Sequence, residues 1–205
     1  MFNLLSIGGL IMLVIIACAL IATFIIFERS LYYSNLKKKD ILIFQHARAY
    51  AKVKQYDKAA MYCEAQNTPT GSVLAKVFKT RFMESEDAKE AVLAESSRQL
   101  PKLEHLLTSL GTIANISTLL GLLGTVTGNI EAFGVLGSAG STGDPSMLAG
   151  AIAQALITTA AGLVISIPSI VFYNHFTNHV NKTVNNLENE ITDLMLLIRG
   201  KESDV

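Results

Sequence analysis

Charged residues are scarce in this sequence, and two long stretches have almost none. They make up 17% of the 205 residues, whereas a soluble domain usually carries about 25%. Residues 1–27 contain no charge, and between His105 and His175 only Glu131 and Asp144 are charged. The deficit indicates segments that lie inside a membrane. The net charge is zero, so nothing in the composition favours a nucleic-acid partner.

Cysteine is also scarce, and tryptophan is absent. Cys18 lies in the first apolar stretch and Cys63 in the polar part of the chain, so they have neither metal-ligand spacing nor the pattern of a disulfide framework. We interpret both as free thiols. The polar part shows no Ser/His/Asp, Cys/His or phosphate-cradling arrangement. We therefore expect no catalytic residues, no metal, no cofactor and no enzymatic activity.

The first apolar stretch, residues 4–27, is long enough for a transmembrane helix. A secretory signal peptide is the alternative, but the stretch lacks a basic start and is too long for a signal peptide's apolar core. Glu28 and Arg29 then end it with charge. We predict a retained membrane helix within residues 1–29.

Residues 30–105 are polar and rich in helix formers, which predicts a helical domain. Asp40 and Asp57 are expected to cap two of its helices, and residues 67–71 to end the second. Residues 73–83 form a third amphipathic segment. A fourth helix is expected to start near Ser85 or Asp87 and to run through Pro101 directly into the membrane.

The second apolar stretch, from Leu106 to Phe176, is too long for one membrane crossing, since a spanning helix needs about 20 residues. We predict spans at 106–136 and 147–176, joined by a short loop at 137–146. Asp144 is expected to cap the third helix, with Pro145 in its first position. Residues 177–205 continue it as a cytoplasmic tail, with an apolar stripe at Ile191, Leu194, Met195 and Ile198.

The basic residues predict the orientation in the membrane. Fourteen of the seventeen lysines and arginines lie between Arg29 and Lys102, and the other three follow the third span. The positive-inside rule then places the N-terminus and the 137–146 loop outside, and residues 30–105 and the tail in the cytoplasm. The predicted fold is an all-α membrane protein with three spans and a cytoplasmic helical insert, helices two and three extending into the cytoplasm.

Small and polar residues recur on one face of each later span. Such faces let helix backbones approach closely in a membrane, and we predict helix packing at Gly121, Gly124, Gly128, Gly162 and Pro168. Hydroxyl and amide groups accompany them at Ser117, Thr125, Gln154, Thr158, Thr159 and Ser166. For Ser117, Thr158 and Ser166, packing between helices is the favoured interpretation.

Residues 119–126 read LLGLLGTV, and residues 155–163 read ALITTAAGL and are followed by Ile167-Pro168 and Tyr173-Asn174. In these motifs the two spans resemble the MotA/TolQ/ExbB proton-channel family. Residues 100–104 and 143–145 extend the resemblance. Three spans with an outside N-terminus suit the ExbB/TolQ branch, because MotA-like members have four.

The resemblance implies an assembly in the bacterial inner membrane. Five subunits form a ring, and two single-span partners of the ExbD/TolR type inside it each contribute a membrane aspartate. Ion flow then drives a TonB- or TolA-like transducer. By motif position, Thr125 and Thr159 match polar pore residues, and Gln154 and Thr158 are further pore-lining candidates. Membrane lipid is the remaining partner.

One position departs from the family pattern. Many relatives have a glutamate where this chain has Gln154, which cannot titrate. Glu131 lies about 9 Å along the helix from Thr125, toward the outer face. We therefore expect an interfacial or inter-subunit role for it, not a relay, and treat it as a secondary candidate. A charge at mid-membrane is costly, and this chain offers hydroxyls and an amide there but no central carboxylate. If the chain conducts ions, the titrating or ion-binding group must therefore come from another polypeptide. A TolQ-like subunit and a non-conducting scaffold remain alternatives, and the choice between protons and sodium stays open.

Overall fold

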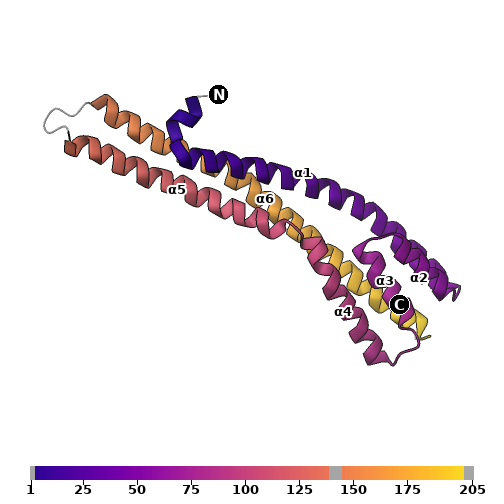
Figure 1. The fold of residues 1–205 in the computed structure, drawn as a ribbon. Coiled ribbons are helices and arrows are strands. Elements are labelled where there is room, and N and C mark those ends of the chain that lie inside the picture. The colour runs from indigo at the N-terminus through magenta and orange to yellow at the C-terminus, as the bar shows by residue number, and fades with distance from the viewer. Residues whose placement is uncertain (1–2, 139–144, 201–205) are drawn as a thin grey trace. The chain divides into compact units, whose positions relative to one another are not determined.

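The chain folds as six helices in the computed structural model, which describes residues 3–138 and 145–200 (Figure 1). The helices are α1 (Asn3–Lys52), α2 (Tyr56–Ala65), α3 (Pro69–Lys79), α4 (Ser85–Glu104), α5 (Leu107–Ser138) and α6 (Pro145–Ile198). Three of them, α1, α5 and α6, are long and apolar enough to cross a membrane. The predicted all-α fold with three candidate spans is therefore confirmed. The predicted Asp144 cap and most of the 137–146 loop lie outside the described residues.

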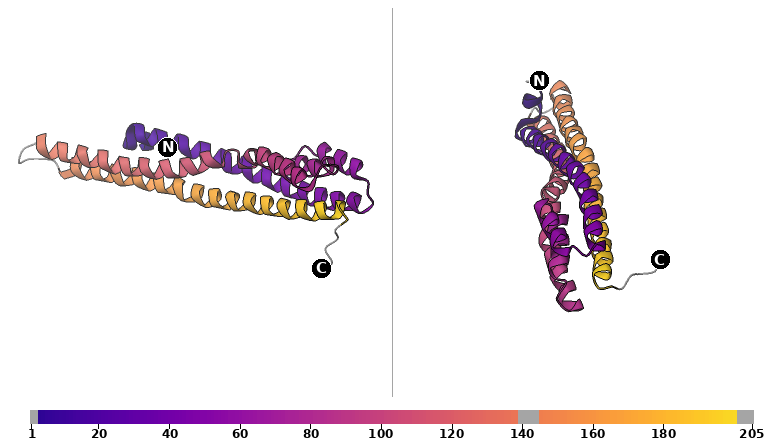
Figure 2. Two further views of the ribbon diagram at one scale, coloured as in Figure 1. Left: turned by 90° about the horizontal axis from the view of Figure 1, so that it is seen from below. Right: turned by 90° about the vertical axis from the view of Figure 1, so that its right-hand side faces the viewer.

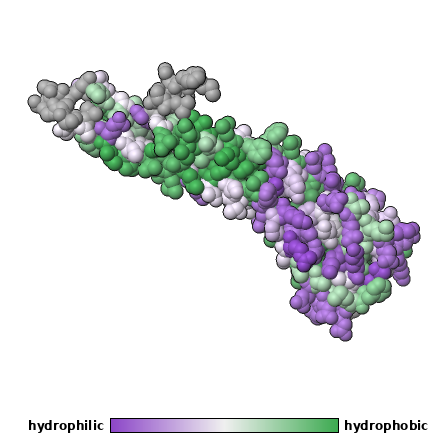
Figure 3. All heavy atoms as spheres, in the orientation of Figure 1, coloured by the Kyte–Doolittle hydropathy of each residue, from purple (hydrophilic) through white to green (hydrophobic). Residues whose placement is uncertain are grey.

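The chain divides into two compact units, each of which draws on both ends of the sequence. The first, hereafter the apolar unit, comprises residues 1–28 and 106–175. Within it, α5 runs beside the first part of α6 in every view (Figures 1 and 2). The face of this unit that Figure 3 shows is largely apolar. Phe24, Leu119 and Val164 are among its exposed apolar side chains. A protein surface of this kind suits a lipid environment.

The first helix is longer than predicted. The α1 helix continues past Glu28 to Lys52, so Asp40 lies inside it and does not cap a new helix. The correction has a simple physical reason, because residues 28–52 contain neither glycine nor proline to stop a helix. A single non-helical residue, Gly9, interrupts α1 near its start, with φ of 54°.

The predicted continuous helix from the polar domain into the second span is wrong. The α4 helix ends at Glu104 and α5 starts at Leu107. Leu106 adopts a left-handed conformation with φ of 65°, which no helix interior tolerates. Pro101 lies inside α4 and does not end it. The break therefore has no glycine or proline at its centre, which is why the sequence did not reveal it.

The junction between α2 and α3 also differs from the prediction. Asp57 lies in the first turn of α2, and Gln55 precedes the helix without a side-chain cap. Residues 67–71 do end α2, but Pro69 already begins α3. Thr68 caps α3 by accepting a hydrogen bond from the amide of Gly71 at 3.0 Å. Pro69 fits the first helical position because that position needs no amide donor.

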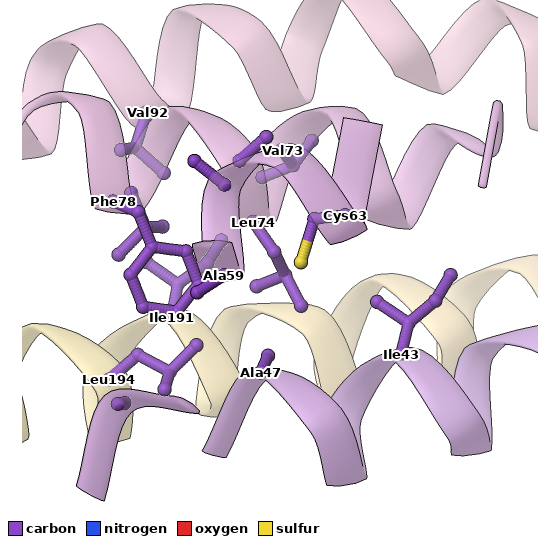
Figure 4. Packing of buried hydrophobic residues seen from close by; sticks show 14 of the residues in the cluster. Ile43, Ala47, Ala59, Cys63, Val73, Leu74, Phe78, Val92, Ile191 and Leu194 are labelled. Carbon is purple, nitrogen blue, oxygen red and sulfur yellow. The ribbon is translucent and has the colours of Figure 1, made fainter. Parts of the chain in front are cut away.

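The second unit, hereafter the polar unit, comprises residues 29–105 and 176–205. Its core is formed by apolar side chains from the later part of α1, from α2, α3 and α4, and from the tail of α6 (Figure 4). The stripe predicted on the tail is part of this core, with Ile191 and Leu194 buried and Met195 and Ile198 packed against them. The predicted continuation of the third span as a helix to the tail is confirmed, because α6 is helical to Ile198.

Candidate functional site

The small residues of α5 and α6 pack directly against each other. We call this contact the α5–α6 seam and define it by Ser117, Gly121, Gly124 and Gly128 of α5 and Ala155, Thr158, Thr159 and Gly162 of α6. A methyl group added at Gly124 would overlap the methyl of Thr158. One added at Gly162 would lie 2.5 Å from the carbonyl oxygen of Ser117. The seam therefore has no room for larger residues at these positions.

Hydrogen bonds join α5 and α6 across the seam. The hydroxyl of Thr159 donates to the carbonyl oxygen of Gly121 at 2.7 Å. The hydroxyls of Thr118 and Ser166 lie 2.7 Å apart. The absence of a side chain at Gly121 permits the first bond, because it lets the backbones approach. Thr159 is only partly buried, so its side chain takes part in the seam and keeps accessible surface.

The four predicted pore residues occupy different environments. Thr125 and Gln154 are partly buried, and the hydroxyl of Thr125 donates to the carbonyl oxygen of Leu122 at 2.6 Å. Thr158 is only 2% exposed, and its hydroxyl donates to the carbonyl oxygen of Gln154 at 3.0 Å. Within one chain, Thr158 is therefore a packing residue. Thr125, Gln154 and Thr159 retain accessible surface.

Glu131 and Pro168 both lie on exposed parts of their helices. Pro168 helps to line a small cavity of about 130 Å³ with Val164 of α6 and with Ala19, Ala22 and Thr23 of α1. Proline at 168 cannot donate to the carbonyl of Val164. A neighbouring helix therefore passes close to the carbonyl that this proline leaves without its helical partner.

Sequence reasoning missed part of this arrangement. Ser117 is fully buried, and its hydroxyl oxygen has no hydrogen-bond partner among the described residues. Gly111 packs against the ring of Tyr173, and Thr118 pairs with Ser166. The periodic small residues indicated a packing face on each helix. They did not indicate which residue of α5 meets which residue of α6, because the register depends on both helices together.

Neither unit has the features of a metal or catalytic centre in the described part of the chain. No group of three His, Cys, Asp or Glu side chains there could hold a metal ion. Burial raises the pKa of the Cys63 thiol to about 12, so it stays protonated and unreactive. The arrangement offers hydroxyls, an amide and close helix contact, which suit ion passage or helix packing.

Comparison with known proteins agrees with these features. The model of the "MotA/TolQ/ExbB proton channel family" matches residues 65–189. The chain is 31% identical over 169 residues to "Putative biopolymer transport protein ExbB-like 1" of Synechocystis sp., covering 81% of this chain and 66% of that one. It is 39% identical over 116 residues to "Biopolymer transport protein exbB1" of Vibrio cholerae, covering 56% and 49%.

A third relative carries a different name. The chain is 33% identical over 120 residues to "Tol-Pal system protein TolQ" of Haemophilus influenzae, covering 55% of this chain and 52% of that one. The matched region thus spans between about half and two thirds of the length of these three relatives. The identities to ExbB-named and TolQ-named proteins are similar, so they do not separate the two branches. The three candidate spans and the α5–α6 seam are the features of a multi-pass membrane protein. Together with the match over residues 65–189, they show that the chain belongs to the MotA/TolQ/ExbB proton channel family, whose members are transport proteins and not enzymes.

Proposed function

We propose that this chain is an ExbB-like subunit of an ion-driven motor in the bacterial inner membrane. In this proposal it works with an ExbD-like single-span partner and energises a TonB-like transducer for transport across the outer membrane. Two of the relatives named above are biopolymer transport proteins of the ExbB type, which supports this branch. The N-terminus and the 137–146 loop face outward, and residues 30–105 and the tail are cytoplasmic.

The observation that carries the proposal is the position of Thr159. Its hydroxyl bonds to the backbone of α5, and its side chain is still partly accessible. Thr125 and Gln154 are likewise partly accessible. In a ring of five chains, these groups line the pore beside the aspartate of the single-span partner. Thr158 supports them from the packed interior.

The same residues explain why a partner is needed. An ion crosses a low-dielectric region only if a polar or charged group replaces its hydration. Gln154 and the threonines offer neutral ligands, and Glu131 is the one carboxylate between His105 and Asp144 in the sequence. The group that takes up the proton therefore comes from the partner, and this chain orients and solvates it.

The test removes the Thr159 hydroxyl without changing the side chain's shape. Thr159→Val should abolish energised transport while the ring still assembles, and Thr159→Ser should keep most of the activity because it keeps the hydroxyl. The measurement is siderophore uptake in a deletion strain, with native mass spectrometry of the purified complex. Wild-type uptake in the Thr159→Val strain would refute the pore assignment. Loss of the ring would instead indicate packing.

Two other functions give different results. A TolQ-like role in envelope maintenance is supported by the TolQ relative. It predicts septation defects with normal siderophore uptake when the gene is deleted. A non-conducting scaffold predicts no proton or sodium flux when the chain and its single-span partner are reconstituted as an intact complex. Flux that depends on the Thr159 hydroxyl would exclude the scaffold.

A further inference from the structure

The polar unit contains an open groove between two of its helices that no part of the proposed motor uses. Its cavity has a volume of about 290 Å³. One wall is formed by Lys37, Asp40, Ile41 and Phe44 of α1, and the other by His179, Lys182, Thr183 and Asn186 of α6. Each set has the spacing i, i+3, i+4, i+7, so each lies on one face of its helix. The two faces therefore meet across the groove.

The polar groups of this groove are mainly hydrogen-bond donors. Lys37 and Lys182 contribute an ammonium group from each wall, and neither takes part in an ion pair of the described residues. Asn186 adds an amide beside Lys182, whereas the Thr183 hydroxyl already donates to the carbonyl oxygen of His179 at 3.1 Å. Two ammonium groups and a neutral donor match the charge and hydrogen-bonding needs of a phosphate group.

One group in the groove, Asp40, opposes an anion when it is ionised. Asp40 is 6% exposed, and its Oδ1 atom has no hydrogen-bond partner in the described chain. Burial raises the pKa of Asp40 to about 6. The carboxyl group is therefore mostly neutral below pH 6, where it can donate to a phosphate oxygen, and mostly ionised above pH 6, where it opposes an anion.

We propose that this groove between α1 and α6 binds a phosphate group, with Lys37 and Lys182 as its charged ligands and Asn186 as a neutral donor. Ile41 and Phe44 make part of the α1 wall apolar, which suits the glycerol portion of a phospholipid headgroup. Lys182 lies about 9 Å along α6 from Phe176, the end of the apolar stretch. Headgroups extend about 5–8 Å beyond the hydrocarbon, and a lysine stem can reach toward them.

The phosphate can come from a lipid headgroup or from solution, and the experiment separates these sources. The full-length chain, purified in neutral detergent with its oligomer intact, is incubated with phosphatidylglycerol, with phosphatidylcholine or with inorganic phosphate. Native mass spectrometry counts retained lipid, and calorimetry measures phosphate binding. Retention of phosphatidylglycerol over phosphatidylcholine without phosphate binding indicates the lipid source. Phosphate binding at the same residues indicates the soluble source.

The variants test the groove against general positive charge. Lys37→Ala combined with Lys182→Ala should lower affinity about tenfold or more, since two charge-assisted contacts are lost. Lys38→Ala with Lys39→Ala removes equal charge from lysines that do not line the groove, and should change affinity less than about twofold because exposed charges are screened. At pH 8, Asp40→Asn should raise affinity, because it removes a negative charge from the groove.

Three results would overturn the proposal. These are no binding of either probe by the wild type, equal losses in the two double-lysine variants, or weaker binding after Asp40→Asn. If the Lys37/Lys182 variant fails to fold, Asn186→Leu replaces it. That substitution keeps every charge and removes the neutral donor, so unchanged affinity there would also overturn the proposal.

Discussion

Arg48 of α1 holds Glu190 of α6 through two parallel hydrogen bonds, although 142 positions separate them in the sequence. The Nε–Oε1 and Nη2–Oε2 distances are both 2.7 Å. The Glu190 side chain is 5% exposed, while that of Arg48 is 53% exposed. Asp193 makes a third, exposed contact with the same guanidinium at 3.1 Å. Glutamate 190 raises the pKa of Arg48 further above its ordinary value, so the guanidinium stays charged.

Removing the arginine should destabilise the polar unit. Arg48→Ala leaves the Glu190 carboxylate buried and unpaired, and the expected cost is about 1–3 kcal/mol, below that of a fully buried pair because the arginine is half exposed. Asp193→Ala is the matched control and should cost less than about 1 kcal/mol. Thermal unfolding of the purified chain, followed by circular dichroism, measures both. Equal melting temperatures for the two variants would contradict the assigned role.

Replacing a glycine with alanine should push α5 and α6 apart only where that glycine lies in the seam. Gly162→Ala places a methyl group 2.5 Å from the backbone carbonyl oxygen of Ser117, an atom that cannot rotate away. Gly150→Ala is the control, because a methyl there has no neighbour within 4 Å and alanine favours helix. We expect Gly162→Ala to lower the melting temperature of the complex and Gly150→Ala to leave it unchanged or raise it. An unchanged melting temperature for Gly162→Ala would mean that α5 and α6 lie further apart than in this structure.

The seam and the spans were accessible to sequence reasoning for a physical reason. A bilayer imposes helices and apolar length, and close helix contact requires small residues, so both leave periodic patterns. Gly121, Gly124 and Gly162 therefore marked the packing faces. The pattern did not separate Thr158, which is buried, from Thr159, which remains partly accessible. One step along a helix rotates a side chain by about 100°, and only the register of the partner helix decides which one is enclosed.

The polar unit was harder to predict because its structure depends on distant contacts. Aspartate is a common residue at helix N-caps, but the chain on both sides of Asp40 is helical. Its burial comes from the packing of helices far apart in the sequence. The break at Leu106 likewise lacks a local signal. The pairing of Arg48 with Glu190 is another contact without a local signal, because the sequence position of a charged residue does not specify its partner.

Asp40 should make the polar unit less stable as the pH rises. Its pKa is raised from 3.8 to about 6 by burial, and the side chain of Thr70 opposes this only in part. The folded state thus favours the protonated form. Ionisation of Asp40 therefore costs the folded state no stability below pH 4. The loss of stability grows between pH 4 and 6 and is complete above pH 6. This change in the pKa of Asp40 corresponds to about 3 kcal/mol of stability.

Asp40→Asn should therefore stabilise the chain most at neutral pH. Asparagine has nearly the same shape and carries no charge, so it avoids the penalty at every pH. The melting temperature of Asp40→Asn minus that of the wild type should rise from pH 4 to 6 and stay level from pH 6.5 to 8. A difference that stays constant or falls over this range would show that burial does not perturb this carboxyl group.

Lys54 occupies a position at the end of α1 that favours glycine. Its φ is 58°, a left-handed conformation that costs a non-glycine residue about 1 kcal/mol or more. Two backbone bonds define the position, from the Lys54 amide to the Ala51 carbonyl and from the Gln55 amide to the Tyr50 carbonyl, both 3.0 Å. This pair is the Schellman motif, and its left-handed residue is usually glycine.

Lys54→Gly should therefore stabilise the polar unit by up to about 1 kcal/mol. The control is Lys58→Gly, which places glycine inside α2 and should destabilise by about 1 kcal/mol. Both lysines are exposed, so melting temperatures that shift in the same direction would contradict a conformational origin.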